Sequence, residues 1–397
     1  MTGTFESQMA ALADVGRAPH GGYARFAWTP TDLALREWFV GEAVGRGLDV
    51  VEDRAGNLWA WWGDPDADGP GVVTGSHLDS VPGGGAFDGP LGVVSAFAAV
   101  DALRAAGRTP SRPLGVVAFC DEEGARFGLA CVGSRALTGA LDTDRGLALQ
   151  DDDGVSLAEA LRAAGRDPTA WGADPEALGR VGTFVELHVE QGRALSEVET
   201  RTGRRAAVGV GSGIWPHGRW RVDLQGRADH AGTTALADRQ DPMLDLAALV
   251  LATRDAADAA GALATVGKVV VEPNGVNAIP SSVRAWVDAR AEDEGRVRAV
   301  LSALGRFAPR EESWTPTTTF DPALAQRLAA LVDGPVVATG AGHDAGILAA
   351  AGIPTAMLFV RNPTGVSHSP HEFAEPEDCD AGIAALTTVL RDLTEAP

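Results

Sequence analysis

Histidines and carboxylates that could bind metal occur in four short segments of the chain. The segments carry His77 with Asp88, Asp121 with Glu122 and Glu123, His188, and His368 with His371. Each segment alone is equally typical of a surface hydrogen bond, an acidic turn or a packed histidine. Together, two imidazoles, a central carboxylate and a further carboxylate with an imidazole would complete two metal sites that share one bridge. This mixed nitrogen and oxygen set suits Zn, Mn, Co or Ni.

Other carboxylates in these segments could support the chemistry of such a centre. Asp79 stands two residues after His77, close enough to accept a hydrogen bond from its ring and fix its tautomer. Glu122 and Glu123 are adjacent and point in different directions, so one can bind metal while the other moves protons.

The candidate residues follow segments that have the pattern of buried strands. Apolar runs at 71–76 and 114–120 alternate with an alanine-rich helical run at 92–107. This alternation indicates an α/β sheet covered by helices. The ends of such strands and the loops after them are where α/β enzymes place their chemistry. A first helix is expected over 31–47, with Thr31 as its N-cap.

A second pattern begins near Val210 and predicts a smaller α+β domain with a half-exposed sheet. Its order is β-α-β-β-α, with a long helix at 242–260 and the alternating strand SSVRAWVDAR. The stretch PREESWTPTTTFDP is typical of a loop, and the α/β pattern then returns with ALAQRLAALVDG and PTAMLFV. We therefore expect a discontinuous catalytic domain of residues 1–209 and 318–397, with an inserted domain of residues 210–317.

The composition argues against several classes of function. A formal net charge of −21 should repel nucleic acid and anionic membranes. Lys268 is the single lysine, which disfavours a Schiff base or a phosphate-binding Walker loop. The three cysteines form no CxxC pair, so buried free thiols are expected. No apolar run suits a membrane span and the N-terminus has no targeting pattern, which predicts a cytoplasmic protein.

An ordered series of motifs resembles the M20-type metal-dependent amidohydrolases. The series is GSHLDSVPGGGAFDG, DEEGARF, ELHVEQG, HAGTT, NAIP, AGHDA and GVSHSPHE, and it runs over about residues 24–373. Within the family it is most similar to the N-carbamoyl-L-amino acid hydrolase and allantoate amidohydrolase branch. The resemblance implies a mixed-sheet, dinuclear-metal catalytic domain with two divalent ions per subunit. It also implies an inserted lid that forms a homodimer.

The resemblance implies a role for each candidate residue of the metal centre. Its metal ligands would be His77, Asp88, Glu123, His188 and His371. Asp88 would bridge the two ions, and Glu122 would be the general base. His230 of HAGTT would reach in from the partner subunit's lid and stabilise the tetrahedral oxyanion. Peptidase-like relatives tend to place a carboxylate at the position of His188, so its imidazole favours the carbamoylase branch.

The resemblance also implies a set of substrate-binding residues. They are Gln191 for the carbamoyl group, Asn277 and Arg290 for a substrate carboxylate, and Gly342 and His343 in the pocket. A planar guanidinium offers a carboxylate two parallel hydrogen bonds, which suits Arg290 to its role.

Two positions depart from the pattern of the branch. Ala235 replaces the usual proline after the threonines, which concerns the rigidity of the lid. Arg361 and Asn362 stand where proline and serine are common. Arg361 could select a substrate with a second carboxylate, such as a glutamate or aspartate derivative, and a solvated loop arginine is the alternative.

These features predict hydrolysis of a linear amide or ureido C–N bond in an N-carbamoyl-L-amino acid or an allantoate-like small molecule. The products would include ammonia, and carbon dioxide from a carbamoyl group. One alternative is an amidohydrolase for N-formyl, N-formimino or N-acyl acidic amino acids. Another is an aminoacylase or dipeptidase. A protein of a different class, a catalytically inactive binding dimer, is the last alternative.

Overall fold

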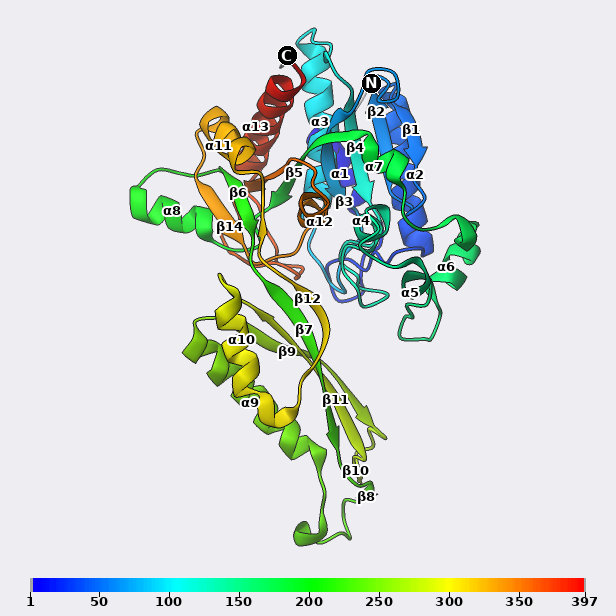
Figure 1. Ribbon diagram of the computed structural model, residues 1–397, viewed down its shortest axis with the longest axis vertical. Coiled ribbons are helices and arrows are strands. Elements are labelled where there is room, and N and C mark those ends of the chain that lie inside the picture. Colours follow the sequence, from blue (N-terminus) through cyan, green and yellow to red (C-terminus); the bar gives the residue numbers. More distant parts are fainter. Residues whose placement is uncertain (1–2, 396–397) are drawn as a thin grey trace. The chain divides into compact units, whose positions relative to one another are not determined.

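The computed structural model describes residues 3–395, which form two compact units (Figure 1). Unit 1 comprises the described residues up to Gly213 together with those from Thr319 onward. Unit 2 comprises Ile214–Thr318 and is inserted into the chain of unit 1. None of the helices within 3–395 is long and apolar enough to cross a membrane.

Unit 1 contains a mixed sheet and most of the helices. Its strands are β1 (Asp49–Glu52), β2 (Leu58–Trp62), β3 (Gly71–His77), β4 (Leu114–Phe119), β5 (Val181–Val189), β6 (Val208–Ile214), β13 (Thr318–Thr319), β14 (Val336–Thr339) and β15 (Thr355–Val360). Its helices are α1 (Phe5–Leu12), α2 (Pro30–Gly45), α3 (Pro90–Ala105), α4 (Val132–Leu137), α5 (Thr143–Leu147), α6 (Leu157–Ala163), α7 (Pro175–Gly179), α8 (Ala194–Thr202), α11 (Pro322–Val332), α12 (Asp344–Ala350) and α13 (Pro376–Glu395), with a 3-10 turn, η1, at Pro168–Ala170.

The strands of unit 1 follow the order β1-β2-β4-β3-β5-β15-β6-β13, and β14 pairs with β6. The central strands β4, β3, β5 and β15 are mutually parallel, while β2 runs antiparallel to β4 and β6 runs antiparallel to β15. Every residue of β3, β4 and β15 is buried, as expected of parallel strands covered on both faces. This architecture confirms the predicted mixed α/β sheet.

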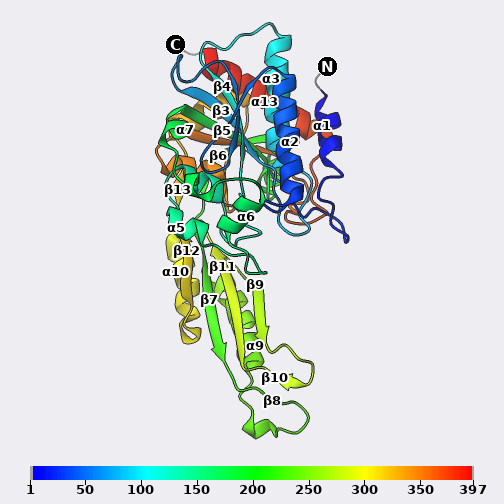
Figure 2. The same ribbon diagram turned by 90° about the vertical axis from the view of Figure 1, so that its right-hand side faces the viewer.

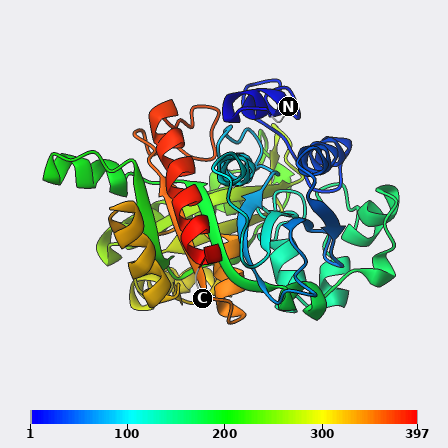
Figure 3. The same cartoon turned by 90° about the horizontal axis from the view of Figure 1, so that it is seen from above.

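Helices α3 and α13 pack against each other and against the central strands (Figures 2 and 3). Their apolar side chains join the strands in one core, which includes Phe97, Val100, Leu187, Leu358, Leu386 and Val389. Burying such a side chain contributes about 1.5–3 kcal/mol, so this core holds the central strands in fixed register. Helix α12 packs against β5 and β15 as well.

The first long helix, α2, forms where it was predicted, but its N-cap differs. Thr29 accepts a hydrogen bond from the backbone N–H of Asp32, and Pro30 occupies the first helical turn. The predicted cap, Thr31, lies inside the helix. Proline favours the first turn because its fixed φ suits a helix and its missing N–H leaves no donor unsatisfied there.

Parallel pairing brings the carboxyl ends of the central strands to one edge of the sheet. β3 ends at His77, β4 runs into Asp121, β5 ends at Val189 and β15 ends at Val360. The loops that follow therefore lie near one another, which is the usual location of a site in this class of fold.

Unit 2 is an antiparallel sheet covered on one face by two helices (Figure 1). Its elements are β7 (His217–Gln225), β8 (Asp229–His230), η2 (Leu236–Asp238), α9 (Pro242–Ala260), β9 (Leu263–Glu272), β10 (Ala278–Ile279), β11 (Ser282–Arg290), α10 (Glu294–Ala303), η3 (Gly305–Phe307) and β12 (Arg310–Thr315). The sheet has the order β12-β7-β11-β9, and β8 pairs with β10. Strand β11 alternates buried and less buried residues, which confirms the predicted half-exposed sheet.

One predicted loop is an edge strand. β12 pairs with β7 within the stretch PREESWTPTTTFDP, and its register shifts between Glu311 and Ser313. Charged residues at Arg310 and Glu311 are exposed and hide the alternating pattern of a strand. Charges and irregular register are common on edge strands, where they discourage pairing with another chain.

Candidate metal centre

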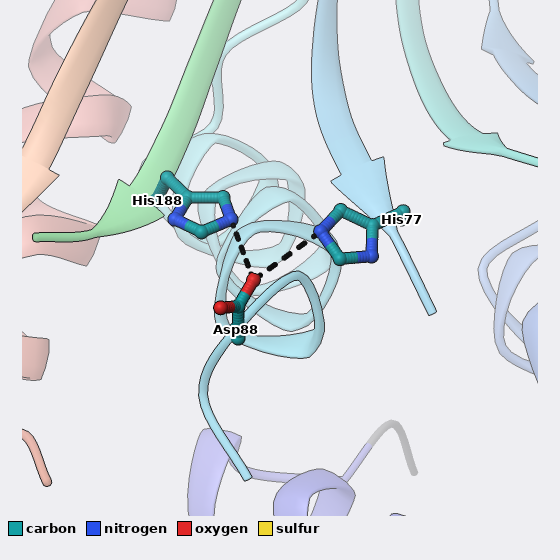
Figure 4. A group of neighbouring side chains, drawn as sticks. All are labelled: His77, Asp88 and His188. Carbon is teal, nitrogen blue, oxygen red and sulfur yellow. Dashed lines mark ion pairs between the residues drawn. The ribbon is translucent and has the colours of Figure 1, made fainter. Parts of the chain in front are cut away.

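His77, Asp88 and His188 converge in unit 1 (Figure 4). The Nε2 atom of His77 lies 3.5 Å from Asp88 Oδ1, and the Nε2 atom of His188 lies 3.3 Å from the same oxygen. All three side chains are buried. Neither Nε2 atom has a hydrogen-bond partner among the described residues. Buried polar atoms are rarely left without a partner, so this arrangement fits a bound cation.

Backbone contacts orient the two imidazoles toward Asp88. His188 Nδ1 lies 2.8 Å from the carbonyl oxygen of Val189, and His77 Nδ1 lies 3.2 Å from that of Asp79. A carbonyl can only accept, so each Nδ1 carries a proton, and Nε2 is left as the ring nitrogen that can bind a cation. Gly89 begins α3 beside His77 with φ of 84°, and a Cβ there would lie 2.5 Å from the His77 ring.

Asp79 links the loop after β3 to the turn after β4. Its Oδ1 lies 3.4 Å from His77 Nδ1 and accepts a hydrogen bond from the backbone N–H of Glu122. Its Oδ2 accepts from the backbone N–H of Glu123. One buried carboxylate therefore orients an imidazole and also fixes the turn that carries two candidate acids.

A second group of ligand atoms forms on the other carboxylate oxygen of Asp88. His368 Nε2 lies 3.6 Å from Asp88 Oδ2 and 3.5 Å from Glu123 Oε2. Glu122 lies closer to the first group, with its Oε2 at 3.8 Å from His77 Nε2. One carboxylate oxygen of Asp88 therefore faces the imidazoles of His77 and His188, and the other faces the imidazole of His368. A ligand that bridges two cations needs this geometry.

The structure places His368, rather than the predicted ligand His371, beside Asp88 and Glu123. His371 is exposed, and its backbone N–H donates to Ser369 Oγ. His368 has a positive φ of 53°, and its ring meets Glu123 and Asp88. Two histidines three residues apart in a loop cannot be distinguished by spacing, because the direction of each depends on the backbone.

The prediction for Arg361 is also corrected. Its guanidinium lies 2.9 Å from Glu199 and Glu375 and 3.0 Å from Asp378, and only 11% of the side chain is exposed. These carboxylates come from α8, from the residue before α13 and from α13 itself. Arg361 is therefore neither a solvated loop arginine nor a group that is open to bind a substrate carboxylate.

Other predicted substrate residues in unit 1 lie at the centre. Gln191 Nε2 donates to Asp88 Oδ2 at 2.9 Å, and its Oε1 is buried without a hydrogen-bond partner among the described residues. The His343 ring is buried and packs edge-on against His188, with 4.6 Å between ring centroids. Gly342 is half-buried in the same loop before α12.

The remaining predicted residues belong to unit 2. His230 is exposed, and its Nδ1 accepts a hydrogen bond from Gly232 N–H. The exposed Asn277 accepts from Ala231 N–H with its backbone carbonyl. Arg290 donates to both oxygens of Asp288, at 2.7 and 3.0 Å.

Several functional contacts come from residues that the sequence reasoning did not select. Ser367 Oγ donates to Asp88 Oδ2, and Glu372 accepts from the backbone of the Asp88 loop. Glu186 is fully buried in β5 and accepts from Ser76 Oγ and Ala345 N–H. Charged side chains are rarely buried without a specific role, so a glutamate inside an apolar strand is a signal that the sequence contains. This signal could have identified Glu186.

Burial and mutual charge control the protonation of the centre. Burial raises the pKa of the Glu122 and Glu123 carboxyls well above their usual range, and neighbouring carboxylates act in the same direction. Burial alone would raise the pKa of Asp88, but the adjacent imidazoles of His188 and His77 hold it well below its usual range. Burial alone would lower the pKa of His77, but Glu122, Asp79 and Asp88 raise it well above its usual range.

The donor set fits divalent cations. The described side chains form three overlapping groups whose ligand atoms could each surround an ion: His77–Asp88–His188, Asp88–Glu123–His368 and Glu186–His188–His343. The first two share Asp88, and the Nε2 atoms of His77 and His188 are buried without a hydrogen-bond partner among the described residues. Buried carboxylates are costly unless paired or bound to metal, and cations would favour the ionised carboxylates.

Comparisons with known proteins agree with the motifs. Residues 73–392 match the family described as Peptidase family M20/M25/M40. The chain is 36% identical to an N-carbamoyl-L-amino acid amidohydrolase of Geobacillus stearothermophilus, over 98% of this chain and 97% of that protein. It is 30% identical to an allantoate amidohydrolase of Bacillus subtilis, over 96% and 95% of the two chains.

A solved structure extends the agreement to the fold. The crystal structure of an amidase of the hydantoinase/carbamoylase family from Burkholderia vietnamiensis is 30% identical and matches with a TM-score of 0.89. The match covers 99% of this chain and 97% of that one. The resemblance inferred from the motifs is thereby confirmed, and the chain belongs to Peptidase family M20/M25/M40.

Proposed function

We propose that the protein is a metal-dependent amidohydrolase that cleaves a linear amide or ureido C–N bond in a small carboxylate-bearing substrate. The observation that carries this proposal is the placement of Asp88 between two groups of potential ligands. The substrate class is supported by relatives named N-carbamoyl-L-amino acid amidohydrolase, allantoate amidohydrolase and ureidoglycolate hydrolase. The expected products include ammonia, with carbon dioxide from a carbamoyl group.

Each ligand group would hold one divalent cation. His77 and His188 would complete one site, Glu123 and His368 the other, and Asp88 would belong to both. The nitrogen and oxygen donors suit Zn, Mn, Co or Ni. Two such cations would polarise the scissile carbonyl and lower the pKa of the attacking water.

Glu122 is assigned as the general base. Its carboxyl is buried beside His77 and is not needed as a ligand in either group. It takes a proton from the water that attacks the carbonyl carbon, and returns it to the leaving nitrogen as the C–N bond breaks.

Gln191, Gly342 and His343 would bind the substrate beside the centre, since all three lie in loops at the same edge of the sheet. From unit 2, Asn277 and Arg290 would hold the substrate carboxylate. His230 would donate a hydrogen bond to the oxyanion of the tetrahedral intermediate.

We assign His230 to the site of a partner subunit in a homodimer formed through unit 2. β9 is an edge strand with an open backbone edge, and α9 exposes Leu244 and Leu251 seven residues apart on one helical face. An open strand edge next to an exposed apolar stripe is suited to association with a second copy.

The test is ammonia release by protein loaded with Mn, Zn or Co. The substrates are allantoate and N-carbamoyl-L-amino acids with acidic, neutral and aromatic side chains. Metal-dependent release that Glu122→Gln abolishes would support the proposal. Hydrolysis of N-acetyl or N-formyl amino acids without ammonia release would favour the acyl alternative over a ureido substrate, and metal-loaded protein that is inert on every substrate would contradict the proposal.

A further inference from the structure

Glu372 lies directly behind the backbone of the bridging carboxylate. Its Oε2 atom accepts hydrogen bonds from the backbone N–H groups of Phe87 and Asp88, at 2.8 and 3.0 Å. The side chain is buried, with 7% of the residue exposed. It therefore contacts the peptide groups from which the Asp88 side chain projects, rather than that side chain itself.

The packing around Glu372 leaves little freedom. A Cβ added to Gly85 would lie 2.1 Å from Glu372 Oε2 and 2.4 Å from its Cδ, so the loop lies against the carboxyl with no room for a side chain. Glu372 N–H donates to the carbonyl of Ser369, which closes the turn that precedes it. The backbone of Glu372 is therefore held by its own turn, and its carboxyl is held by the Asp88 loop.

The same turn delivers two other contacts to Asp88. Ser367 Oγ lies 3.2 Å and His368 Nε2 lies 3.6 Å from Asp88 Oδ2. Segment 367–372 thus provides His368, a candidate ligand for one cation. The same segment contacts the backbone of Asp88, the candidate ligand for both cations. The loop after β3 and the loop after β15 can therefore take up their positions only together.

We propose that Glu372 is a positioning residue, which sets the backbone at Asp88 so that its two carboxylate oxygens face the two ligand groups. This inference rests on the proposed metal-dependent function. An oxygen that accepts from two backbone N–H groups satisfies both buried donors at once, and so fixes the backbone that carries them. Loss of the acceptor leaves two buried donors unsatisfied, and the loop must shift to satisfy them.

Substitutions can separate positioning from charge. Glu372→Gln keeps an oxygen acceptor for the two N–H groups but removes the negative charge. Glu372→Met keeps the approximate shape but removes the acceptor. Gly85→Ala disturbs the same contact from the side of the loop, which keeps the idea testable if the Met variant does not fold.

Asp174 offers a matched control away from the centre. Like Glu372 it is a buried carboxylate that accepts from two backbone N–H groups, those of Arg54 and Ala177. Asp174→Leu should therefore cost stability through the same loss of acceptors without a change in cation binding.

The experiment is a calorimetric titration of chelator-treated protein with Co²⁺, together with the visible spectrum of bound Co²⁺ and the melting temperature. Glu372→Met and Gly85→Ala should weaken the binding of at least one cation by about 10- to 100-fold, the usual effect of losing a partner that orients a ligand. Their Co²⁺ spectra should change, Glu372→Gln should remain close to wild type, and Asp174→Leu should change only the melting temperature.

Two results would overturn the inference: wild-type cation binding in Glu372→Met, or an equal loss in Glu372→Gln, which would assign the effect to charge. Failure of the wild-type protein to bind any Co²⁺ would instead overturn the proposed function.

Discussion

His368 directs its Nε2 atom to Oδ2 of Asp88 at 3.6 Å, while Oδ1 of the same carboxylate faces His77 and His188. This relationship makes Asp88 the residue that two candidate ligand groups share, the buried group with His77 and His188 and the more exposed group with Glu123 and His368. It also decides between the two histidines of the loop before α13, of which only one contacts the shared residue. The following predictions test the roles that this arrangement assigns.

His368→Ala should remove one cation per subunit and lower kcat by about 10²- to 10³-fold, because a metal contributes several kcal/mol of transition-state stabilisation. His371→Ala is the matched control and should leave both quantities close to wild type, since none of the candidate ligand groups among the described residues includes it. Metal analysis and steady-state kinetics measure the two effects. Equal damage by the two substitutions would refute the assignment of His368.

Glu122→Gln should lower kcat by about 10²- to 10⁴-fold, the range expected when a general base is lost. KM and metal content should change little, because the side chain is assigned to proton transfer rather than to either ligand group. Kinetics and metal analysis on the same preparation are sufficient. Loss of metal from this variant would show that Glu122 is a ligand instead.

A mixture of two inactive variants tests whether His230 serves the partner subunit. If it does, a heterodimer of Glu122→Gln and His230→Ala subunits contains one site with both residues intact. Random exchange should then restore about a quarter of the wild-type activity. If His230 acts within its own subunit, every site lacks one residue, and the mixture will stay inactive.

Asp53 should make the free energy of unfolding depend on pH. Burial raises the pKa of its carboxyl to about 6 from 3.8, even though Asn57 and Trp59 donate hydrogen bonds to it. The folded state retains the proton longer than the unfolded state as pH rises. Stability should therefore fall between pH 3.8 and about 6, by about 3 kcal/mol, and then stay level.

Urea unfolding of wild type and Asp53→Asn across this range measures the effect. The asparagine variant keeps an oxygen acceptor but cannot ionise, so it should lose this part of the pH dependence. A slope that is the same in both proteins would show that Asp53 ionises normally in the folded state.

Arg361→Ala should leave the preference between acidic and neutral substrates unchanged, because its guanidinium is already engaged by Glu199, Glu375 and Asp378. It should lower the free energy of unfolding by about 2 kcal/mol, since hydrogen bonds to charged groups contribute about this much. The substrate panel and urea unfolding test the two halves separately. A changed preference for acidic side chains would restore the original hypothesis.

The sequence was sufficient to predict where the centre lies. His77, His188 and the pair Glu122–Glu123 stand at the ends of apolar runs, and parallel pairing of such runs brings their carboxyl ends together. The alternation of β11 was visible for a similar reason, because a side-chain period of two needs no long-range information.

The errors arose where direction depends on contacts between distant segments. Arg361 was considered as a ligand for a substrate carboxylate, because nothing in the sequence indicates that three carboxylates of the protein bind it. These carboxylates come from α8 and from the region where α13 begins. Glu372 was not predicted, because its partners are backbone N–H groups of a loop far earlier in the chain. Every residue except proline has such a group, so the sequence does not reveal the contact.

The points where the insertion leaves and rejoins unit 1 are neighbours in space, because the N–H of Phe320 donates to the carbonyl of Ser212. All the side chains assigned to the two cation sites and to the general base come from outside Ile214–Thr318. The insertion is therefore a module that can be exchanged, shortened or lengthened by evolution or by design without rebuilding the metal centre. A family built in this way can acquire new substrates by altering one segment while the side chains proposed to hold the cations and to move the proton stay the same.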